Sequence, residues 1–150
     1  AYEKAGELVE HADEVERAYR VALLQLGPSH HFTVKTREAF YQLAVKQNRY
    51  SETIPIVIAL IHHERTNAND KQEILNKFIE LHALYKITDQ VQYEVPTLES
   101  IASLTKEVLG GDTDDYKQAT IALADCYCRQ KDYTKFDILI SRYSLDISCG

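Results

Sequence analysis

A repeat with a period of about 42 residues is the feature that most constrains what this chain can fold into. Phe40, Leu81 and Leu123 follow one another at this period. Four further sets of positions keep the same spacing: Tyr41, His82 and Ala124; Ala44, Tyr85 and Tyr127; Tyr50, Val91 and Tyr133; Val57, Leu98 and Ile140. A fixed period of this length is typical of stacked helix pairs, because one pair alone cannot bury its apolar face. The period therefore predicts an all-α solenoid of antiparallel helix pairs.

Apolar residues recur at helical spacing through most of the chain, and alternation typical of strands is scarce. This pattern predicts about seven helices, over residues 3–26, 33–47, 51–63, 72–87, 96–109, 115–129 and 133–143. Gly27 and Pro28 should end the first helix, and Ser51 should cap the third. Pro96 is expected at the first position of the fifth helix, and Asp112 or Thr113 should cap the sixth.

The composition is that of an ordinary globular protein and excludes several classes. The 150 residues are 45% hydrophobic and 27% charged, which argues against disorder. No stretch reaches the roughly 18 apolar residues of a membrane span, so no membrane partner is expected. The formal net charge of -6 argues against a nucleic-acid partner. Because Tyr50, Tyr85, Tyr127 and Tyr133 occupy repeat positions, we expect them to pack in the core rather than to stack on bases.

No constellation for catalysis or metal binding is found in the sequence, so neither an enzyme nor a cofactor, and neither a catalytic nor a metal-binding residue, is predicted. The three cysteines, Cys126, Cys128 and Cys149, are odd in number and lie late in the chain. They do not form a disulfide framework. We expect free thiols, with Cys126 packed against a neighbour and Cys128 on the opposite face, which favours a reducing, cytoplasmic location.

One segment resembles the first helix and turn of a tetratricopeptide (TPR) repeat. Leu123, Ala124, Tyr127 and Tyr133 fill its large, small, aromatic and post-turn tyrosine positions. The segment 26–30, Leu-Gly-Pro-Ser-His, resembles the linker of kinesin-light-chain-type repeats, whose period of about 42 residues exceeds the usual value of about 34. The resemblance implies a TPR-like solenoid that binds a segment of another protein in a concave groove lined by the first helix of each pair.

The period divides residues 1–150 into one repeat domain, with a partial first repeat at 1–32 and further repeats at 33–70, 71–111 and 112–150. Because the first unit is incomplete and the chain has no Met, we expect a piece of a longer protein. Residue by residue, the resemblance places these positions in the groove: Lys35, Glu38, Gln42, Val45 and Lys46; Asn76, Ile79, Ala83 and Lys86; Gln118, Ile121, Asp125, Cys128 and Arg129.

Three cations of that set fall at or beside one repeat position. Lys46, Lys86 and Arg129 together predict a basic stripe suited to an acidic peptide. Alternatively, they only complement helix C-termini. The predicted function is a non-catalytic scaffold or adaptor that binds a protein segment. The alternatives are a structural spacer or a self-association element that forms homo-oligomers, and a helical accessory domain of a larger enzyme or regulator.

Overall fold

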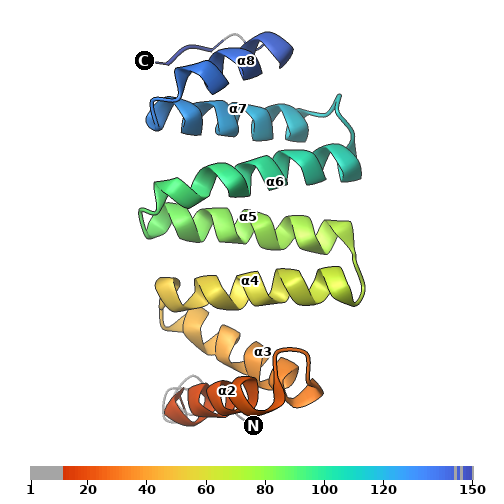
Figure 1. Ribbon diagram of the computed structural model, residues 1–150, viewed down its shortest axis with the longest axis vertical. Coiled ribbons are helices and arrows are strands. Elements are labelled where there is room, and N and C mark those ends of the chain that lie inside the picture. The colour runs from red at the N-terminus through yellow and green to blue at the C-terminus, as the bar shows by residue number, and fades with distance from the viewer. Residues whose placement is uncertain (1–11, 144, 146, 150) are drawn as a thin grey trace. The chain divides into compact units, whose positions relative to one another are not determined.

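The computed structural model describes residues 12–143, 145 and 147–149, and these residues contain seven α-helices and no strand (Figure 1). The helices are α2 (Ala12–Leu26), α3 (His31–Lys46), α4 (Tyr50–Thr66), α5 (Lys71–Ile87), α6 (Val91–Leu109), α7 (Asp114–Arg129) and α8 (Tyr133–Tyr143). The predicted all-α class is therefore confirmed. The chain divides into two compact units, one ending at His63 and the other starting at Glu64, and each is described by itself.

In the first unit, α2 packs against α3 around an aromatic pair. The rings of Tyr19 and Phe40 lie 5.7 Å apart between centroids and are both buried. Thr33 is also buried, and its hydroxyl donates a hydrogen bond to the Ala22 carbonyl at 3.2 Å. The buried Arg37 donates to the Pro28 carbonyl at 2.7 Å and lies over the Tyr19 ring. The linker between α2 and α3 is thus tied to α3 by a buried guanidinium.

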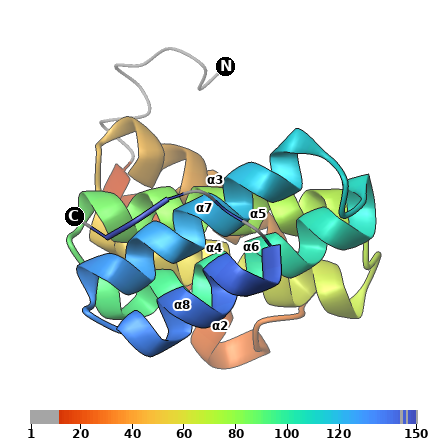
Figure 2. The same ribbon diagram turned by 90° about the horizontal axis from the view of Figure 1, so that it is seen from above.

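In the second unit, α6 packs against both α5 and α7, and α8 packs against α7 (Figures 1 and 2). The repeat-register residues Leu81, Tyr85, Leu123 and Tyr127 are buried here, as Phe40 is in the first unit. Their burial confirms the register that the sequence period predicts. Tyr50 and Tyr133 are exposed, so the prediction that they pack in the core is wrong. Both are the first residues of helices, where a side chain has few neighbours to pack against.

Three equivalent turns show the period in the backbone itself. Asn48, Asp89 and Lys131 follow one another at the repeat spacing and have φ of 56°, 55° and 60°, in the left-handed region. The residue after each donates its N–H to the carbonyl five positions earlier: Arg49 to Ala44, Gln90 to Tyr85 and Asp132 to Tyr127, each at 2.9 Å. This is the hydrogen bond that closes a helix C-terminus when a left-handed residue follows it. Each of these helix pairs is therefore joined by the same turn.

Two predicted helix starts are wrong. The fifth predicted helix begins at Val91 rather than Pro96, and Ser51 lies inside α4 rather than capping it. The reason is the tight turn, because its left-handed residue is followed within two positions by the next helix. Pro55 and Pro96 are the sixth residues of α4 and α6, and both are exposed.

Other predicted ends agree with the structure. Gly27 follows α2 with φ of 84°, and Thr113 caps α7 by accepting a hydrogen bond from the Tyr116 N–H. The start of the first predicted helix, at residue 3, lies outside the described residues.

Candidate functional site

A hollow of about 410 Å³ lies on the second unit where α5, α6 and α7 meet. Each helix contributes one stripe at helical spacing, because side chains three, four or seven residues apart share a face. The stripes are Gln72, Leu75, Ile79 and His82 on α5; Leu98, Ile101, Thr105 and Leu109 on α6; and Asp115, Gln118, Ala119 and Ala122 on α7. Since α6 packs against both other helices, it forms the floor of a groove between α5 and α7.

The groove combines an apolar interior with polar side chains at its edge. Leu75, Leu98 and Ile101 are buried in its walls, whereas Ile79 is 51% exposed. A single exposed isoleucine is ordinary on a protein surface, but this one adjoins an apolar hollow with polar groups at its edge, which is where binding sites usually lie. On α5 the Gln72 amide donates to the Asn76 side-chain oxygen at 3.0 Å, which places carboxamide groups beside the apolar wall. The surface can therefore accept an apolar side chain and hydrogen-bond a neighbouring polar chain.

Beside the groove, a buried carboxylate joins the same three helices. The side chain of Glu94, on α6, is 3% exposed. The Arg129 guanidinium of α7 donates to both of its oxygens, at 3.2 and 3.3 Å, and His82 Nε2 of α5 lies 3.1 Å from Glu94 Oε1. A fork-to-fork contact of this kind fixes geometry as well as charge. Arg129 Nε also donates to Asp125, at 3.2 Å, so the charge of Arg129 is already compensated.

A second depression lies at the C-terminal end of α7, lined by Asp125, Cys128, Arg129, Tyr133 and Cys149. Cys128 and Cys149 form a disulfide, with Cα atoms 5.4 Å apart. The expectation of three free thiols is therefore wrong for this pair. Residues 21 positions apart meet here because the chain after α8 returns to α7. Cys126 is free and buried, as expected.

This helical architecture is similar to that of solved structures of other proteins. No model of a known family and no curated protein matches the chain. Solved structures do match. One of them comes from Podosopora anserina and is described as "kinesin light chain nearly identical TPR-like repeats". Its TM-score is 0.57 and its sequence identity is 15%, and the match covers 95% of this chain and 68% of that one. A variant form of the same protein gives a TM-score of 0.55, also at 15% identity, with the same two coverages.

BtubC (BKLC) from P. vanneervenii is similar with a TM-score of 0.56 and 14% identity, covering 95% of this chain and 57% of that one. Both proteins match almost the whole of this chain. The chain has a TPR-like repeat fold. At these identities the likeness establishes the fold alone, and it confirms the TPR resemblance that the sequence predicts.

The structure places the predicted partner-binding residues of this TPR-like fold in four groups. Ile79 and Gln118 line the groove. Asp125, Cys128 and Arg129 line the second depression. In the first unit the predicted positions are all exposed on α3: Lys35, Glu38, Gln42, Val45 and Lys46. The remaining four lie on α5 or α7 outside both linings, with Asn76, Ala83 and Lys86 exposed and Ile121 partly buried. Their role in partner binding stays a prediction.

Several lining residues of the TPR-like groove are not predicted from the sequence. Leu98, Ile101, Thr105 and Leu109 come from α6, the second helix of a pair, whereas the resemblance placed only first helices in the groove. The signal available in the sequence is their helical spacing, which marks one face of that helix. Glu94 was also missed, because a glutamate near the start of a helix is usually an exposed residue that favours the helix dipole.

The described residues show neither a metal cluster nor a membrane span. No three His, Cys, Asp or Glu side chains among them are placed to hold a metal ion together. Within the same part of the chain, no helix combines the length and the apolar character needed to cross a bilayer.

The burial of His82 predicts that the protein loses stability as the pH falls. Burial lowers the pKa of His82 below 6.5, as do the charges of Lys86 and Arg129, against the opposing effect of Glu94. The unfolded chain therefore binds the His82 proton more readily than the folded one. This contribution is complete above about pH 6.5 and is lost as the pH falls from there through the folded pKa.

Glu94 extends this loss of folding stability to lower pH. Burial acts to raise its pKa, but the hydrogen bonds and charges of Arg129 and His82 outweigh burial and hold the pKa below 4.5. Its stabilisation is present above about pH 4.5 and is lost below it.

We expect His82→Gln to flatten the dependence of the unfolding free energy on pH just below 6.5, measured by urea denaturation. If the slope of the His82→Gln variant below pH 6.5 equals that of the parent protein, the assignment to His82 is contradicted.

Proposed function

We propose that the groove between α5 and α7 binds a segment of a partner protein, with an apolar side chain in the hollow. The observation that carries the proposal is the hollow of about 410 Å³, whose three stripes leave Ile79 half exposed at its edge. Binding a partner's apolar side chain would remove this surface from water, which is the main driving force of association. The protein then acts as a non-catalytic scaffold or adaptor.

We propose that the partner segment carries an acidic residue next to its apolar residue. Lys86 is exposed on α5, one turn beyond His82 in the direction of the C-terminus. A carboxylate of the partner near Lys86 would gain favourable charge contact at the rim, where such pairs govern specificity and association rate. Arg129 is a weaker candidate for this role, because Glu94 and Asp125 already occupy its guanidinium. The proposed basic surface of this unit therefore rests on Lys86.

Selection from a random peptide library on the immobilised protein tests this function. The selected peptides are expected to carry an apolar residue together with Asp or Glu. Ile79→Asp should weaken their binding at least about tenfold, because a charge would replace an apolar contact at the edge of the hollow. Lys86→Glu should weaken acidic peptides and not neutral ones, with the difference largest at low salt.

A matched control is available on α8. Ile138 is 54% exposed, close to the 51% of Ile79, and does not line the groove. Ile138→Asp therefore makes the same chemical change at an equally exposed site and should leave peptide binding at the parent level. If Ile138→Asp weakens binding as much as Ile79→Asp does, the groove is not the binding surface. Titration calorimetry of each variant with one selected peptide gives the comparison.

A further inference from the structure

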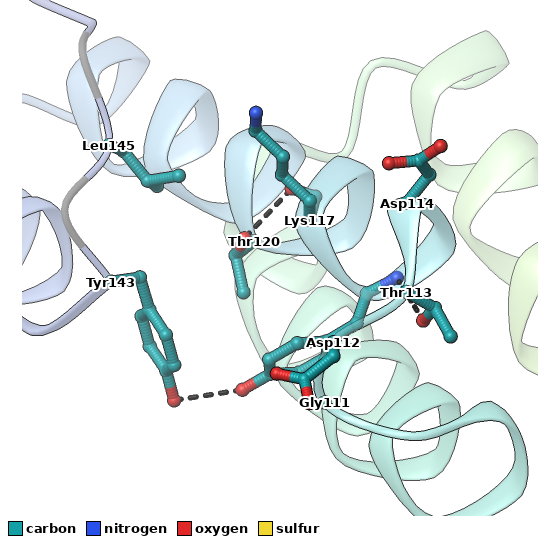
Figure 3. A pocket seen from close by; sticks show the side chains of 9 residues that line it. Gly111, Asp112, Thr113, Asp114, Lys117, Thr120, Tyr143 and Leu145 are labelled. Atoms are coloured by element: carbon teal, nitrogen blue, oxygen red, sulfur yellow. Dashed lines mark hydrogen bonds between the residues drawn. The ribbon is translucent and has the colours of Figure 1, made fainter.

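The chain beyond α8 turns back along α7 and is bonded to its far end. The Leu145 N–H donates to the Ile140 carbonyl at 3.2 Å. Leu145 lies in a pocket with Lys117 and Thr120, in the first half of α7, and Figure 3 shows these side chains together. Four residues later, Cys149 is bonded to Cys128 at the end of the same helix. The described residues 145 and 147–149 thus follow α7 toward its C-terminus (Figure 2).

Tyr143 fixes the point at which this segment leaves α8. Its hydroxyl and that of Tyr116 on α7 are 2.8 Å apart, and the two rings meet edge to face with centroids 5.7 Å apart. The segment therefore starts at a point held by non-covalent contacts and ends at a covalent one. Between them, Leu145 and Ile147 are only partly buried and Ser148 is exposed. The disulfide is the strongest attachment of the segment's far end to α7.

We propose that the Cys128–Cys149 disulfide is a redox-sensitive latch that holds residues 145 and 147–149 against α7 and restricts access to the depression beside Arg129. Cys149 itself forms part of the lining, with Asp125, Arg129 and Tyr133. When the latch opens, the segment leaves and that side of α7 becomes available to a partner. This last step rests on the proposed partner-binding function, whereas release of the segment does not.

The opening reaction needs a dithiol reductant. One of its thiolates attacks a sulfur of the disulfide, forms a mixed disulfide and expels the other cysteine as a thiolate, which takes up a proton. The second thiol of the reagent then displaces the remaining cysteine and closes its own disulfide. The protein gains two electrons and two protons, and the reagent is oxidised by the same amount. A reducing compartment supplies dithiols of this kind, so the latch would report on the redox state there.

Hydrogen exchange read by mass spectrometry tests the latch on the whole chain. In the air-oxidised protein, an intact-mass measurement after alkylation in denaturant is expected to show one free thiol, that of Cys126. Addition of dithiothreitol should speed amide exchange in residues 145–149 by about tenfold or more, while the buried face of α6 stays protected. The variant Cys128→Ser with Cys149→Ser should exchange rapidly with or without the reagent. Cys126→Ser keeps the latch and should respond as the parent does.

A second measurement tests the restriction of access. Peptides are selected from the random library on the Cys128→Ser, Cys149→Ser variant and then titrated against the parent protein. Binding to the oxidised parent should be at least about tenfold weaker than to the reduced parent. Exchange in 145–149 that does not change on reduction, or three alkylated thiols in the air-oxidised protein, would overturn the latch. Equal binding in both redox states would overturn the restriction of access.

The exchange and binding measurements distinguish failure of the latch from failure of the proposed function. If selected peptides ignore Ile79→Asp yet depend on reduction, the groove assignment fails and the latch stands. If no peptide is retained by either redox form, the partner-binding function and the restriction of access are both refuted. Release of residues 145–149 is then judged by exchange alone.

Discussion

Truncation of Leu123 to alanine is expected to lower the free energy of unfolding by about 2–5 kcal/mol, the range for large-to-small changes in a packed core. Leu81→Ala should fall in the same range. Both side chains are buried, at equivalent positions of successive helix pairs, and the cavity left by either cannot be filled by its rigid helical neighbours. Urea denaturation followed by far-UV circular dichroism measures the change.

Ile87→Ala provides the control for this pair. Ile87 is the last residue of α5, the helix that carries Leu81, and it is 58% exposed. A surface change of this kind is expected to alter stability by about 0.5 kcal/mol or less. If Leu81→Ala or Leu123→Ala unfolds at the same urea concentration as Ile87→Ala, that leucine is not a core position and the assigned repeat register is wrong.

Removal of Arg129 is the second large effect that we expect. Arg129→Ala leaves the Glu94 carboxylate buried with His82 as its remaining described partner. Loss of a partner from a buried charge costs about 3–5 kcal/mol when both groups are fully buried. Since the Arg129 side chain is 43% exposed, and Glu94 can take up a proton instead, we expect about 2–3 kcal/mol.

Two comparisons isolate the buried charge as the cause. Asp125→Ala removes the exposed partner of Arg129 and should cost less than about 1 kcal/mol, the value of a surface ion pair. The double variant Glu94→Met with Arg129→Met removes both charges and should recover most of the stability lost in Arg129→Ala. A double variant that is no more stable than Arg129→Ala would show that Arg129 acts through packing of its side chain instead.

The helical repeat could be predicted from the sequence because its signal is local and repeated. Leu81 and Leu123 carry the same type of residue one period apart, and the turns after their helices, at Asp89 and Lys131, keep the same spacing. Each copy therefore supports the interpretation of the others. The start of α6 was misplaced because proline is favoured at the first position of a helix, whereas Pro96 is the sixth residue of α6. Only the turn at Asp89 shows where this helix begins.

The Glu94 cluster and the disulfide could not be predicted in this way, because both depend on contacts between distant positions. Glu94 and Arg129 are 35 residues apart, and neither differs in type from the exposed charges that surround it. Whether a glutamate is buried depends on which guanidinium the fold brings to it. The Cys128–Cys149 pair depends likewise on the path of the chain after α8, for which the repeat pattern has no equivalent. For the same reason the sequence could not show that Arg129, a member of the predicted basic stripe, is already paired with Glu94.

The three left-handed turns explain how the fold can persist while the sequence changes. Asn48 and Asp89 belong to types that adopt this conformation readily, whereas Lys131 does not, yet all three have nearly the same φ and the same closing hydrogen bond. That bond joins main-chain groups, so any residue except proline at the donor position can make it. Mutation can therefore erase the resemblance between the repeats of one molecule, and between this chain and its structural neighbours, long before it alters how successive helices are joined.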